Sequence, residues 1–244
     1  MIHTADSPKH IVIIGRSGGI AGALAKIISE TMSADSCIHS FSRHQPSTVY
    51  PGERIHLLDD YEESSLNKVV DRLPETIHQV WVATGMLSNP DVTPEKALKQ
   101  ITAEQLQRSF VANAVVPALM AKIFIPKLAR RVPSLFACLS ARVGSISDNR
   151  LGGWYSYRAS KAALNMIIKS AAIETARTHP EAIIVGFHPG TVATSLSQAY
   201  LKTLDPSHVF SPDQAAHHLL NVSRSLTPQQ SGRFFAWDGQ EIQP

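Results

Sequence analysis

The stretch HIVIIGRSGGIAG, residues 10–22, sets a run of apolar residues directly before a cluster of glycines. The run predicts a buried β-strand over His10–Ile14, and the glycines predict a tight turn into a helix over Gly19–Met32. Two functions fit a strand, turn and helix of this composition. Gly15 to Gly19 match the G-x-S-x-G turn of a hydrolase, with Ser17 as the nucleophile, and they also match a glycine-rich turn that holds the phosphates of a dinucleotide.

Strands and helices are expected to alternate along the rest of the chain. Short runs of β-type residues predict strands at Cys37–Phe41, Arg54–Leu57, Gln79–Ala83, Leu135–Leu139, Ile183–Phe187 and Arg233–Ala236, and longer patterns predict helices at Glu62–Leu73, Ala103–Ala129, Ser156–Thr178 and Pro212–Ser223. This alternation predicts an α/β fold, a Rossmann-type doubly wound parallel sheet of about seven strands with helices on both faces. Because no linker or repeat interrupts it, a single domain over residues 1–244 is expected.

Composition limits the classes of function. Apolar residues make up 43% of the chain, charged residues 18%, and the net charge is +3 with scattered basic residues, so no nucleic-acid partner is expected. The N-terminus does not resemble a signal peptide, and no run of about 18 apolar residues predicts a membrane span. Cys37 and Cys138 are expected to be free thiols in a reducing, cytoplasmic setting. The adjacent His217 and His218 diverge on a predicted helix, so no metal site is expected.

The position of the glycine turn disfavours the hydrolase. That fold builds part of its oxyanion hole from a loop before the nucleophile strand, and only 14 residues precede Gly15. In a doubly wound sheet, ligands bind at the carboxyl ends of the strands, and the N-terminus of the following helix attracts phosphate. We therefore expect a pyrophosphate site at Gly15 and Gly19, with Ser17 as a phosphate ligand.

The end of the second strand indicates which dinucleotide would bind. A site selective for NAD(H) has an Asp or Glu there to bind the ribose 2′-hydroxyl, but this strand ends Phe41-Ser42-Arg43-His44. Because a guanidinium binds phosphate through two hydrogen bonds, Arg43 and Arg16 could converge on a 2′-phosphate. The alternative is that both arginines are solvated at the surface. NADP(H) is expected in preference to NAD(H).

A second group of residues opens the predicted helix over Ser156–Thr178. Tyr157 and Lys161 are four residues apart and so share one face of that helix. An ammonium near a phenol lowers the phenol pKa from its usual value toward neutrality, which would make Tyr157 a proton donor and acceptor at physiological pH. The alternative is a buried tyrosine beside a solvated lysine.

Together the two motifs resemble those of the short-chain dehydrogenase/reductase family. Gly15-x-x-x-Gly19 is followed about 140 residues later by Tyr157-x-x-x-Lys161. Further similarities lie at Ala83-Thr84-Gly85, at Asn113, and at the segment from His188-Pro189-Gly190 to Thr194. Residues 140–165 and the ending GRFFAWDGQEIQP are similar to the C-factor-like branch of the family, some of whose members are linked to cell–cell signalling. The resemblance covers nearly the whole chain and implies the strand order 3-2-1-4-5-6-7.

The resemblance implies a hydride transfer between NADP(H) and a small carbonyl or alcohol substrate. Tyr157 would act as general acid or base, Lys161 would lower its pKa and bind the nicotinamide ribose, and Asn113 would hold a water that links Lys161 to solvent. Val192 and Thr194 would fix the carboxamide, and Asp59 would lie near the adenine. The full set of expected cofactor contacts is Gly15, Arg16, Ser17, Gly19, Ile20, Ser42, Arg43, Asp59, Ala83, Gly85, Tyr157, Lys161, Pro189, Val192 and Thr194.

Two positions depart from the family pattern. Ala21 stands where the third glycine of the turn is usual, and one methyl group there is expected to be tolerated. The serine that usually polarises the carbonyl is replaced by Ala141, and loss of one such donor costs on the order of 10²–10³ in rate. We expect Ser140 to take this role if the strand end twists, with Ser145 and Ser147 as other candidates. The gap also supports an alternative function, an NADP(H)-binding sensor or C-factor-like signalling protein with little turnover.

Two expectations concern larger features. Ser195–Phe210 follows the Pro-Gly segment and is expected to form a mobile substrate lid. The predicted helices Ala103–Ala129 and Ser156–Thr178 are apolar on more than one face, and in the family equivalent helices form a dimer interface. A homodimer or homotetramer is therefore expected.

Overall fold

The fold is built on a seven-stranded parallel sheet. The computed structural model describes residues 9–89, 92–198, 205 and 208–244. The strands are β1 (His10–Ile14), β2 (Cys37–Ser42), β3 (Glu53–Leu57), β4 (Gln79–Val82), β5 (Ser134–Leu139), β6 (Ala182–His188) and β9 (Phe234–Ala236). Their order is β3-β2-β1-β4-β5-β6-β9, and every neighbouring pair is parallel. The predicted fold class and strand order are confirmed.

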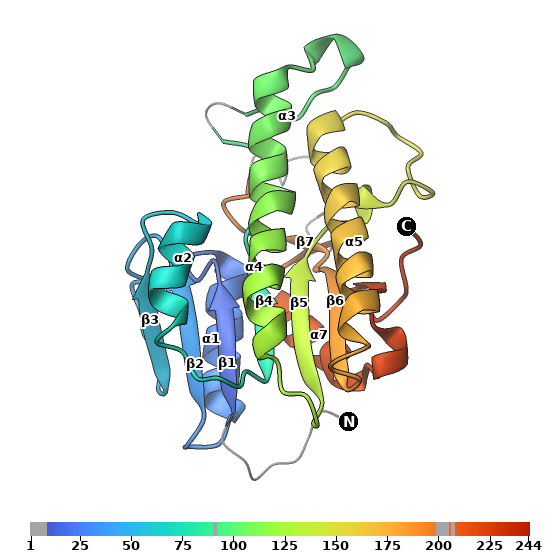
Figure 1. Ribbon diagram of the computed structural model, residues 1–244. Coiled ribbons are helices and arrows are strands. Elements are labelled where there is room, and N and C mark those ends of the chain that lie inside the picture. The colour runs from blue at the N-terminus through green and yellow to red at the C-terminus, as the bar shows by residue number, and fades with distance from the viewer. Residues whose placement is uncertain (1–8, 90–91, 199–204, 206–207) are drawn as a thin grey trace.

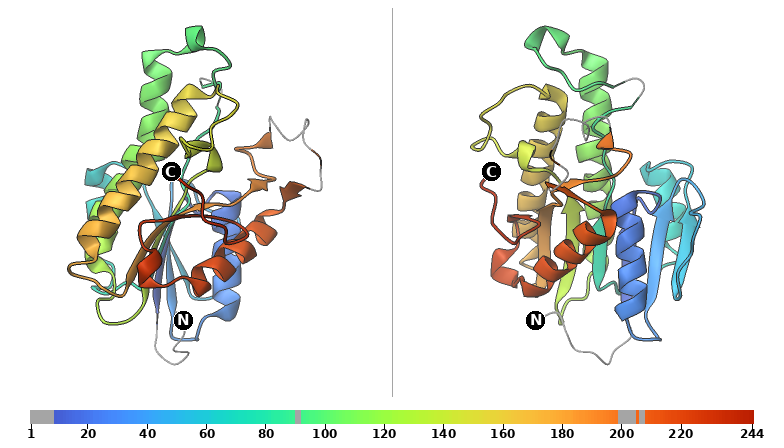
Figure 2. Two further views of the ribbon diagram at one scale, coloured as in Figure 1. Left: turned by 90° about the vertical axis from the view of Figure 1, so that its right-hand side faces the viewer. Right: turned by 180° about the vertical axis from the view of Figure 1, so that it is seen from behind.

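Helices cover both faces of the sheet (Figures 1 and 2). One face carries α1 (Gly19–Thr31) and α7 (Pro212–Ser225), and the other carries α2 (Glu63–Val70), α4 (Val116–Phe124) and α5 (Tyr155–Thr175). The β1 strand shows why: Val12 and Ile14 belong to the core under α4, while Ile11 and Ile13 belong to the core under α1. A strand buried on both faces reads as a continuous apolar run, which is how the sequence predicts it.

The long helix expected over Ala103–Ala129 changes its winding near the middle. It consists of α3 (Ala103–Phe110), the π-helical turn η2 (Val111–Val115), α4, and the 3₁₀ turn η3 (Ile125–Lys127). Pro117 has no N–H to donate to the carbonyl of Asn113 four residues earlier, so the regular α-helical bond is missing there. π turns of this kind occur frequently at functional sites. Asn113 lies in the middle of the turn.

The same helix is long and apolar enough, by length and composition alone, to cross a membrane. Residues Ala103–Lys127 form a 25-residue helical run whose most apolar window has a mean hydropathy of 1.6. Half of that window is buried inside the fold. A core helix of a folded domain meets the same criteria of length and composition.

The smaller elements lie outside the main sheet. The strands β7 (Thr191–Val192) and β8 (Val209–Phe210) pair in parallel as a second sheet, which the sequence did not predict. Three 3₁₀ turns complete the described structure: η1 (Leu98–Gln100), η4 (Arg142–Gly144) and η6 (Pro228–Gln230). Cys37 and Cys138 are free thiols, as expected.

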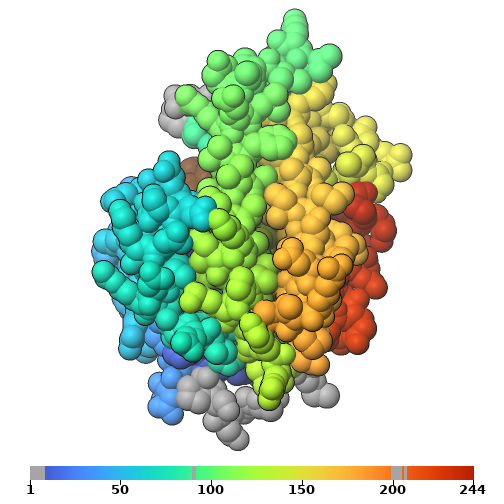
Figure 3. Space-filling model, viewed as in Figure 1, coloured from blue at the N-terminus to red at the C-terminus, as the bar shows by residue number. Residues whose placement is uncertain are grey.

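The helices α4 and α5 form a continuous surface on one side of the molecule (Figure 3). Several large apolar side chains of η2 and α5 are exposed: Val111, Val115, Met166 and Ile173. Exposed apolar residues that gather on adjacent elements are typical of a contact surface. The expected homodimer or homotetramer stays a prediction that this surface supports.

Candidate active site

The glycine turn at the end of β1 leaves a helix N-terminus open. Gly15 has a φ of 86°, and the N–H groups of Gly15 and Arg16 both donate to the carbonyl of Phe41 at 3.0 Å. The helix α1 then begins without a side-chain cap on Gly18 and without an acidic residue in its first turn. Ser17, Gly18 and Gly19 are exposed. Uncapped N–H groups and the helix dipole make this end of α1 suited to an anion.

Segments far apart in the sequence meet at this turn. A Cβ atom on Gly15 would lie 3.2 Å from the carbonyl carbon and oxygen of Ala83 and from the methyl group of Thr84. A Cβ atom on Gly19 would lie 3.0 Å from the methyl group of Thr194. The structure thus brings the predicted residues Ala83 and Thr194 against the turn. The Thr84 hydroxyl is buried and has no hydrogen-bond partner among the described residues, although sequence reasoning gave Thr84 no role.

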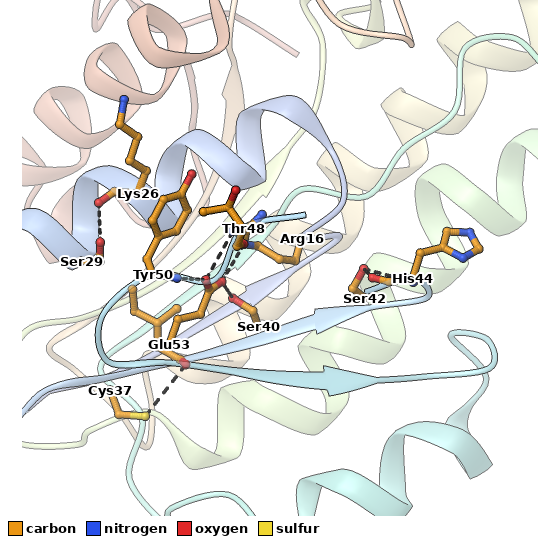
Figure 4. Close-up of polar contacts among 11 residues, drawn as sticks. Arg16, Lys26, Ser29, Cys37, Ser40, Ser42, His44, Thr48, Tyr50 and Glu53 are labelled. Carbon is orange, nitrogen blue, oxygen red and sulfur yellow. Dashed lines mark hydrogen bonds and ion pairs between the residues drawn. The ribbon is translucent and has the colours of Figure 1, made fainter. Parts of the chain in front are cut away.

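Arg16 is held inside the protein and not at a phosphate site (Figure 4). Its Nε donates to Glu53 Oε1 at 2.6 Å, and its Nη2 donates to the carbonyl of Thr48 at 2.9 Å and to Glu53 Oε2 at 3.3 Å. Only 6% of the Arg16 side chain and none of the Glu53 side chain is exposed. The prediction that Arg16 and Arg43 converge on a 2′-phosphate is therefore wrong for Arg16.

The carboxylate of Glu53 joins the glycine turn to β2 and β3. Besides Arg16, it accepts hydrogen bonds from the Ser40 hydroxyl at 2.6 Å and from the N–H of Tyr50 at 3.0 Å. The Tyr50 ring also lies 5.2 Å from the Arg16 guanidinium carbon. Glu53 was missed because it lies just before the predicted strand Arg54–Leu57 without any motif around it, and its partner is 37 residues away.

Arg43 stays available at the end of β2. It is exposed, and its guanidinium carbon lies 5.9 Å from the centre of the Tyr61 ring. Ser42 is buried, and its hydroxyl donates to the carbonyl of His44 at 2.6 Å. Asp59 is exposed just after β3. Arg43 remains the predicted ligand for a 2′-phosphate, and the contacts of Ser42 and Asp59 with a cofactor stay predictions.

Tyr157 and Lys161 are both buried on the side of α5 that faces the carboxyl edge of the sheet. The Lys161 ammonium lies 5.8 Å from the centre of the Tyr157 ring and donates to the carbonyl of Leu139 at 3.0 Å. Gly85 completes the contact, since a Cβ atom there would lie 3.4 Å from Lys161 Nζ and 3.3 Å from Asn113 Oδ1. The structure brings these four predicted residues into one cluster.

The side-chain amide of Asn113 is already bonded. Its Oδ1 accepts from the N–H of Met86 at 2.8 Å, and its Nδ2 donates to the Met86 carbonyl at 2.8 Å and to the Ser160 hydroxyl at 3.1 Å. These bonds fix α5 and the π turn to the segment after β4. A relay water would therefore have to bind the backbone carbonyl of Asn113, which lacks its α-helical donor because residue 117 is proline.

Burial controls the pKa values of the pair. Burial raises the pKa of Tyr157, and it lowers the pKa of Lys161 to about 8. The structure does not meet the expectation that the ammonium lowers the tyrosine pKa toward neutrality, because burial disfavours the charged phenolate and raises the pKa of Tyr157. Tyr157 is thus a protonated phenol at neutral pH.

Ser140 does not face Tyr157. Its hydroxyl donates to Asn165 Oδ1 at 2.9 Å, while Ala141 packs with Tyr157 in an apolar cluster that also contains Leu87, Val143, Trp154 and Leu196. The prediction that Ser140 polarises the carbonyl is therefore wrong, because adjacent residues at a strand end point to different sides. Ser145 does not replace it, since its hydroxyl donates to the carbonyl of Gln243 at 2.5 Å.

The segment after β6 lies beside α1. Val192 is buried in β7 and pairs with Phe210 of β8, and the Ser197 hydroxyl donates to the carbonyl of Val192. Pro189 is half-buried just before β7. Half of the expected lid Ser195–Phe210 lies outside the described residues, which omit 199–204, 206 and 207. The lid stays a prediction.

The fold and the two clusters correspond to a known class of protein. A family model described as short chain dehydrogenase matches residues 9–205. The chain therefore belongs to the short-chain dehydrogenase family and is an oxidoreductase of that family. Within the described residues, no group of three or more His, Cys, Asp and Glu side chains is placed to hold a metal ion.

Individual relatives agree with this assignment. The C-signal protein of Myxococcus xanthus is 32% identical over 147 residues, which cover 60% of this chain and 82% of that protein. The fold is similar to carbonyl reductase Sniffer of D. melanogaster, with a TM-score of 0.84, 20% identity, and coverage of 98% of this chain and 100% of that chain. It is also similar to an NADPH-bound carbonyl reductase from chicken fatty liver, with a TM-score of 0.82, 20% identity, and coverage of 97% and 99%.

The buried ion pair gives a first prediction. Glu53→Gln leaves the Arg16 guanidinium buried without a counter-charge and is expected to lower the free energy of unfolding by about 3 kcal/mol. The matched control is Glu241→Gln, whose partner Arg233 is 45% exposed, and it is expected to change stability by less than about 1 kcal/mol. Urea unfolding monitored by circular dichroism measures both. Equal stability of the two variants would contradict the role given to Glu53.

Proposed function

We propose that the protein is an NADP(H)-dependent oxidoreductase that transfers hydride between the nicotinamide and a small carbonyl or alcohol substrate, with Tyr157 as the general acid or base. One observation carries the proposal. The segment Ala83–Gly85 contacts Gly15 of the open glycine turn at one end and Lys161 and Asn113 at the other. A phosphate site and a proton-transfer site therefore lie at the two ends of one short segment.

The residues present fit a dinucleotide. The uncapped N-terminus of α1 provides donors for a pyrophosphate, and beside it the Thr84 hydroxyl is a buried polar group that has no hydrogen-bond partner within the described part of the chain. Arg43 would bind the 2′-phosphate of NADP(H), which makes NADP(H) the proposed cofactor in preference to NAD(H). When bound, NADPH supplies the hydride that reduces the carbonyl carbon. The carbonyl reductase from chicken fatty liver, which has a similar fold and was solved with NADPH bound, supports this choice.

The chain itself supplies binding and the proton. Because burial raises its pKa, Tyr157 stays protonated at neutral pH and can donate its phenolic proton to the carbonyl oxygen as negative charge develops there. Lys161 has a pKa of about 8, so it can hold or release a proton near neutral pH, and its ammonium would bind the ribose hydroxyls of the cofactor. A water on the backbone carbonyl of Asn113 would connect Lys161 to solvent. Alcohol oxidation is the reverse of these steps.

The walls around Tyr157 suit an apolar substrate. Tyr157 belongs to an apolar cluster with Leu87, Ala141, Val143, Trp154 and Leu196. Apolar walls with one convergent polar group are typical of small-molecule sites. A small carbonyl or alcohol with an apolar body is therefore the proposed substrate class.

A second candidate function follows from Ala141. Without a hydroxyl at this position, the carbonyl oxygen loses one hydrogen-bond donor, and the expected turnover falls by about 10²–10³. An NADP(H)-binding sensor or signalling protein with little turnover would accommodate that loss, and the similarity to C-signal favours it. The buried Tyr157, Lys161 and Asn113 favour the enzyme, because a sensor needs no proton-transfer cluster.

Removal of the phenolic proton tests the chemistry. Tyr157→Phe is expected to abolish NADPH oxidation with aldehydes and ketones, a loss of at least about 10²-fold, while NADPH affinity stays within about threefold of the wild type. Absorbance at 340 nm and calorimetric titration measure the two quantities. If the wild type binds NADPH but turns over no compound in a broad carbonyl and alcohol panel, the sensor is correct.

Restoring a hydroxyl tests the position of Ala141. Ala141→Ser is expected to raise kcat on unactivated ketones by about 10-fold or more, because the new hydroxyl can donate to the developing oxyanion. Ala141→Val, which fills the position with a larger side chain that has no donor, is the control and is expected to lower kcat. Equal kcat for Ala141→Ser and the wild type would show that residue 141 does not reach the reacting oxygen.

The cofactor preference is tested at Arg43. Arg43→Ala is expected to weaken NADPH binding by about 10–100-fold and to leave NADH binding unchanged, because only NADPH carries the phosphate that a guanidinium binds. Arg177→Ala changes an equally exposed arginine beyond the C-terminal end of α5 and is expected to change neither. Parallel loss of affinity for both dinucleotides would contradict a 2′-phosphate contact.

The cytoplasmic location of the protein stays a prediction.

A further inference from the structure

The first turn of α5 has no cap of its own. Trp154 occupies the N-cap position, where its side chain makes no cap hydrogen bond, and its backbone is left-handed at a φ of 51°. A side-chain oxygen at this position ordinarily accepts a hydrogen bond from the second or third N–H of the helix. Tyr157 is the third residue of α5, so the placement of its phenol depends on how this turn is anchored.

Glu95 supplies the missing cap from 61 residues away. Its carboxylate accepts a hydrogen bond from the N–H of Ser156 at 3.2 Å and a second one from the Ser156 hydroxyl. The backbone carbonyl of Glu95 accepts from the N–H of Trp154 at 2.5 Å. Two of the free N–H groups at the start of α5 are therefore bonded to one residue of the segment between β4 and η1.

Burial and charge make this contact specific. Glu95 is only 2% exposed, and a Cβ atom on Gly153 would lie 3.3 Å from its carbonyl oxygen. Burial raises the pKa of the carboxyl group, but the hydrogen bonds from Ser156, the Glu95 backbone and Gln105 together outweigh that effect, and the pKa lies below its usual value. Glu95 is thus ionised at neutral pH and sits at the positive end of the α5 dipole, where a negative charge is favourable.

The segment that carries Glu95 also contributes to the walls of the site. Leu87 packs against Tyr157 and Ala141 in the apolar cluster. Trp154 packs edge-on against Tyr157, with ring centres 6.2 Å apart and an angle of 70° between the planes. Because Glu95 bonds both Trp154 and Ser156, it fixes the indole and the phenol relative to the same segment.

We infer that Glu95 is a positioning residue for Tyr157: its hydrogen bonds to Ser156 and Trp154 hold the start of α5 so that the phenol faces the reacting carbonyl and the indole closes one side of the substrate pocket. The kinetic consequence rests on the proposed function. The anchoring of α5 rests on the contacts alone.

The experiment compares Glu95→Ala and Glu95→Gln with Glu104→Ala. Glu104 is an exposed acid in the first turn of α3 and serves as the matched control. In the cofactor-free protein, Glu95→Ala is expected to speed hydrogen exchange of residues 154–158 by about 10-fold or more, because a charge-assisted bond to the Ser156 N–H is lost. Glu104→Ala is expected to leave this exchange unchanged.

Kinetics then separate positioning from stability. Glu95→Ala is expected to lower kcat by about 10²-fold, as displacement of a proton donor does, while the KM for NADPH changes by less than about threefold. Glu95→Gln keeps an oxygen that can accept from Ser156 and is expected to restore most of kcat. If Glu95→Ala does not fold, Ser156→Ala takes its place, because it removes only the hydroxyl partner of Glu95. Hydrogen exchange and kcat of Ser156→Ala are then compared with those of Glu95→Gln. The loss of kcat in Ser156→Ala is expected to be smaller than that in Glu95→Ala.

The outcomes are distinguishable. Unchanged exchange at residues 154–158 in Glu95→Ala overturns the anchoring, and faster exchange with unchanged kcat overturns the positioning of Tyr157. If the wild type turns over no carbonyl compound, the proposed function fails while the exchange result still decides the anchoring. In that case the titration of the Tyr157 phenol decides the positioning. This titration is obtained as the difference between each protein and the same protein with Tyr157→Phe. Glu95→Ala is expected to shift it, and Glu104→Ala is expected to leave it unchanged.

Discussion

The site depends on the close approach of two backbones at the carboxyl edge of the sheet. The order β3-β2-β1-β4 makes β1 and β4 neighbours, and their register pairs Ile14 with Val82. Gly15, without a side chain and at a positive φ, can then lie against Ala83. This is the point where the order of strands reverses, which is where doubly wound sheets bind their ligands. Any side chain at residue 15 would push the two segments apart.

Two buried cations near this edge, Arg16 and Lys161, have different hydrogen-bond partners. The Arg16 guanidinium has a carboxylate partner in Glu53, so its charge is fixed and it serves the architecture of the turn. Lys161 donates instead to a neutral carbonyl, that of Leu139, and burial lowers its pKa to about 8. A cation whose pKa lies so close to neutrality can gain and lose a proton under physiological conditions. The choice of partner therefore separates a structural cation from one suited to proton transfer.

Much of the fold was predictable because its strands and helices follow from patterns within short stretches of the sequence. All seven main strands coincide with short runs of β-type residues in the sequence, and Tyr157 with Lys161 follows helical spacing. Contacts between distant residues were not predictable. The sequence suggests Arg16 as a surface ligand for phosphate, but in the structure its guanidinium is paired with Glu53. The sequence suggests Ser140 as the replacement for the serine missing at Ala141, but in the structure its hydroxyl is bonded to Asn165. The strands β7 and β8 are two residues each, too short to show a period.

The pairing of Arg16 with Glu53 constrains how this turn can vary among related chains. Either residue without the other leaves a single charge in the interior, which is strongly destabilising, whereas an apolar pair of similar volume removes both charges at once. Residues 16 and 53 are therefore expected to be substituted together, so that related chains have either both charges or neither. A change of cofactor preference has an easier route at Arg43, because an exposed side chain can be exchanged without a partner.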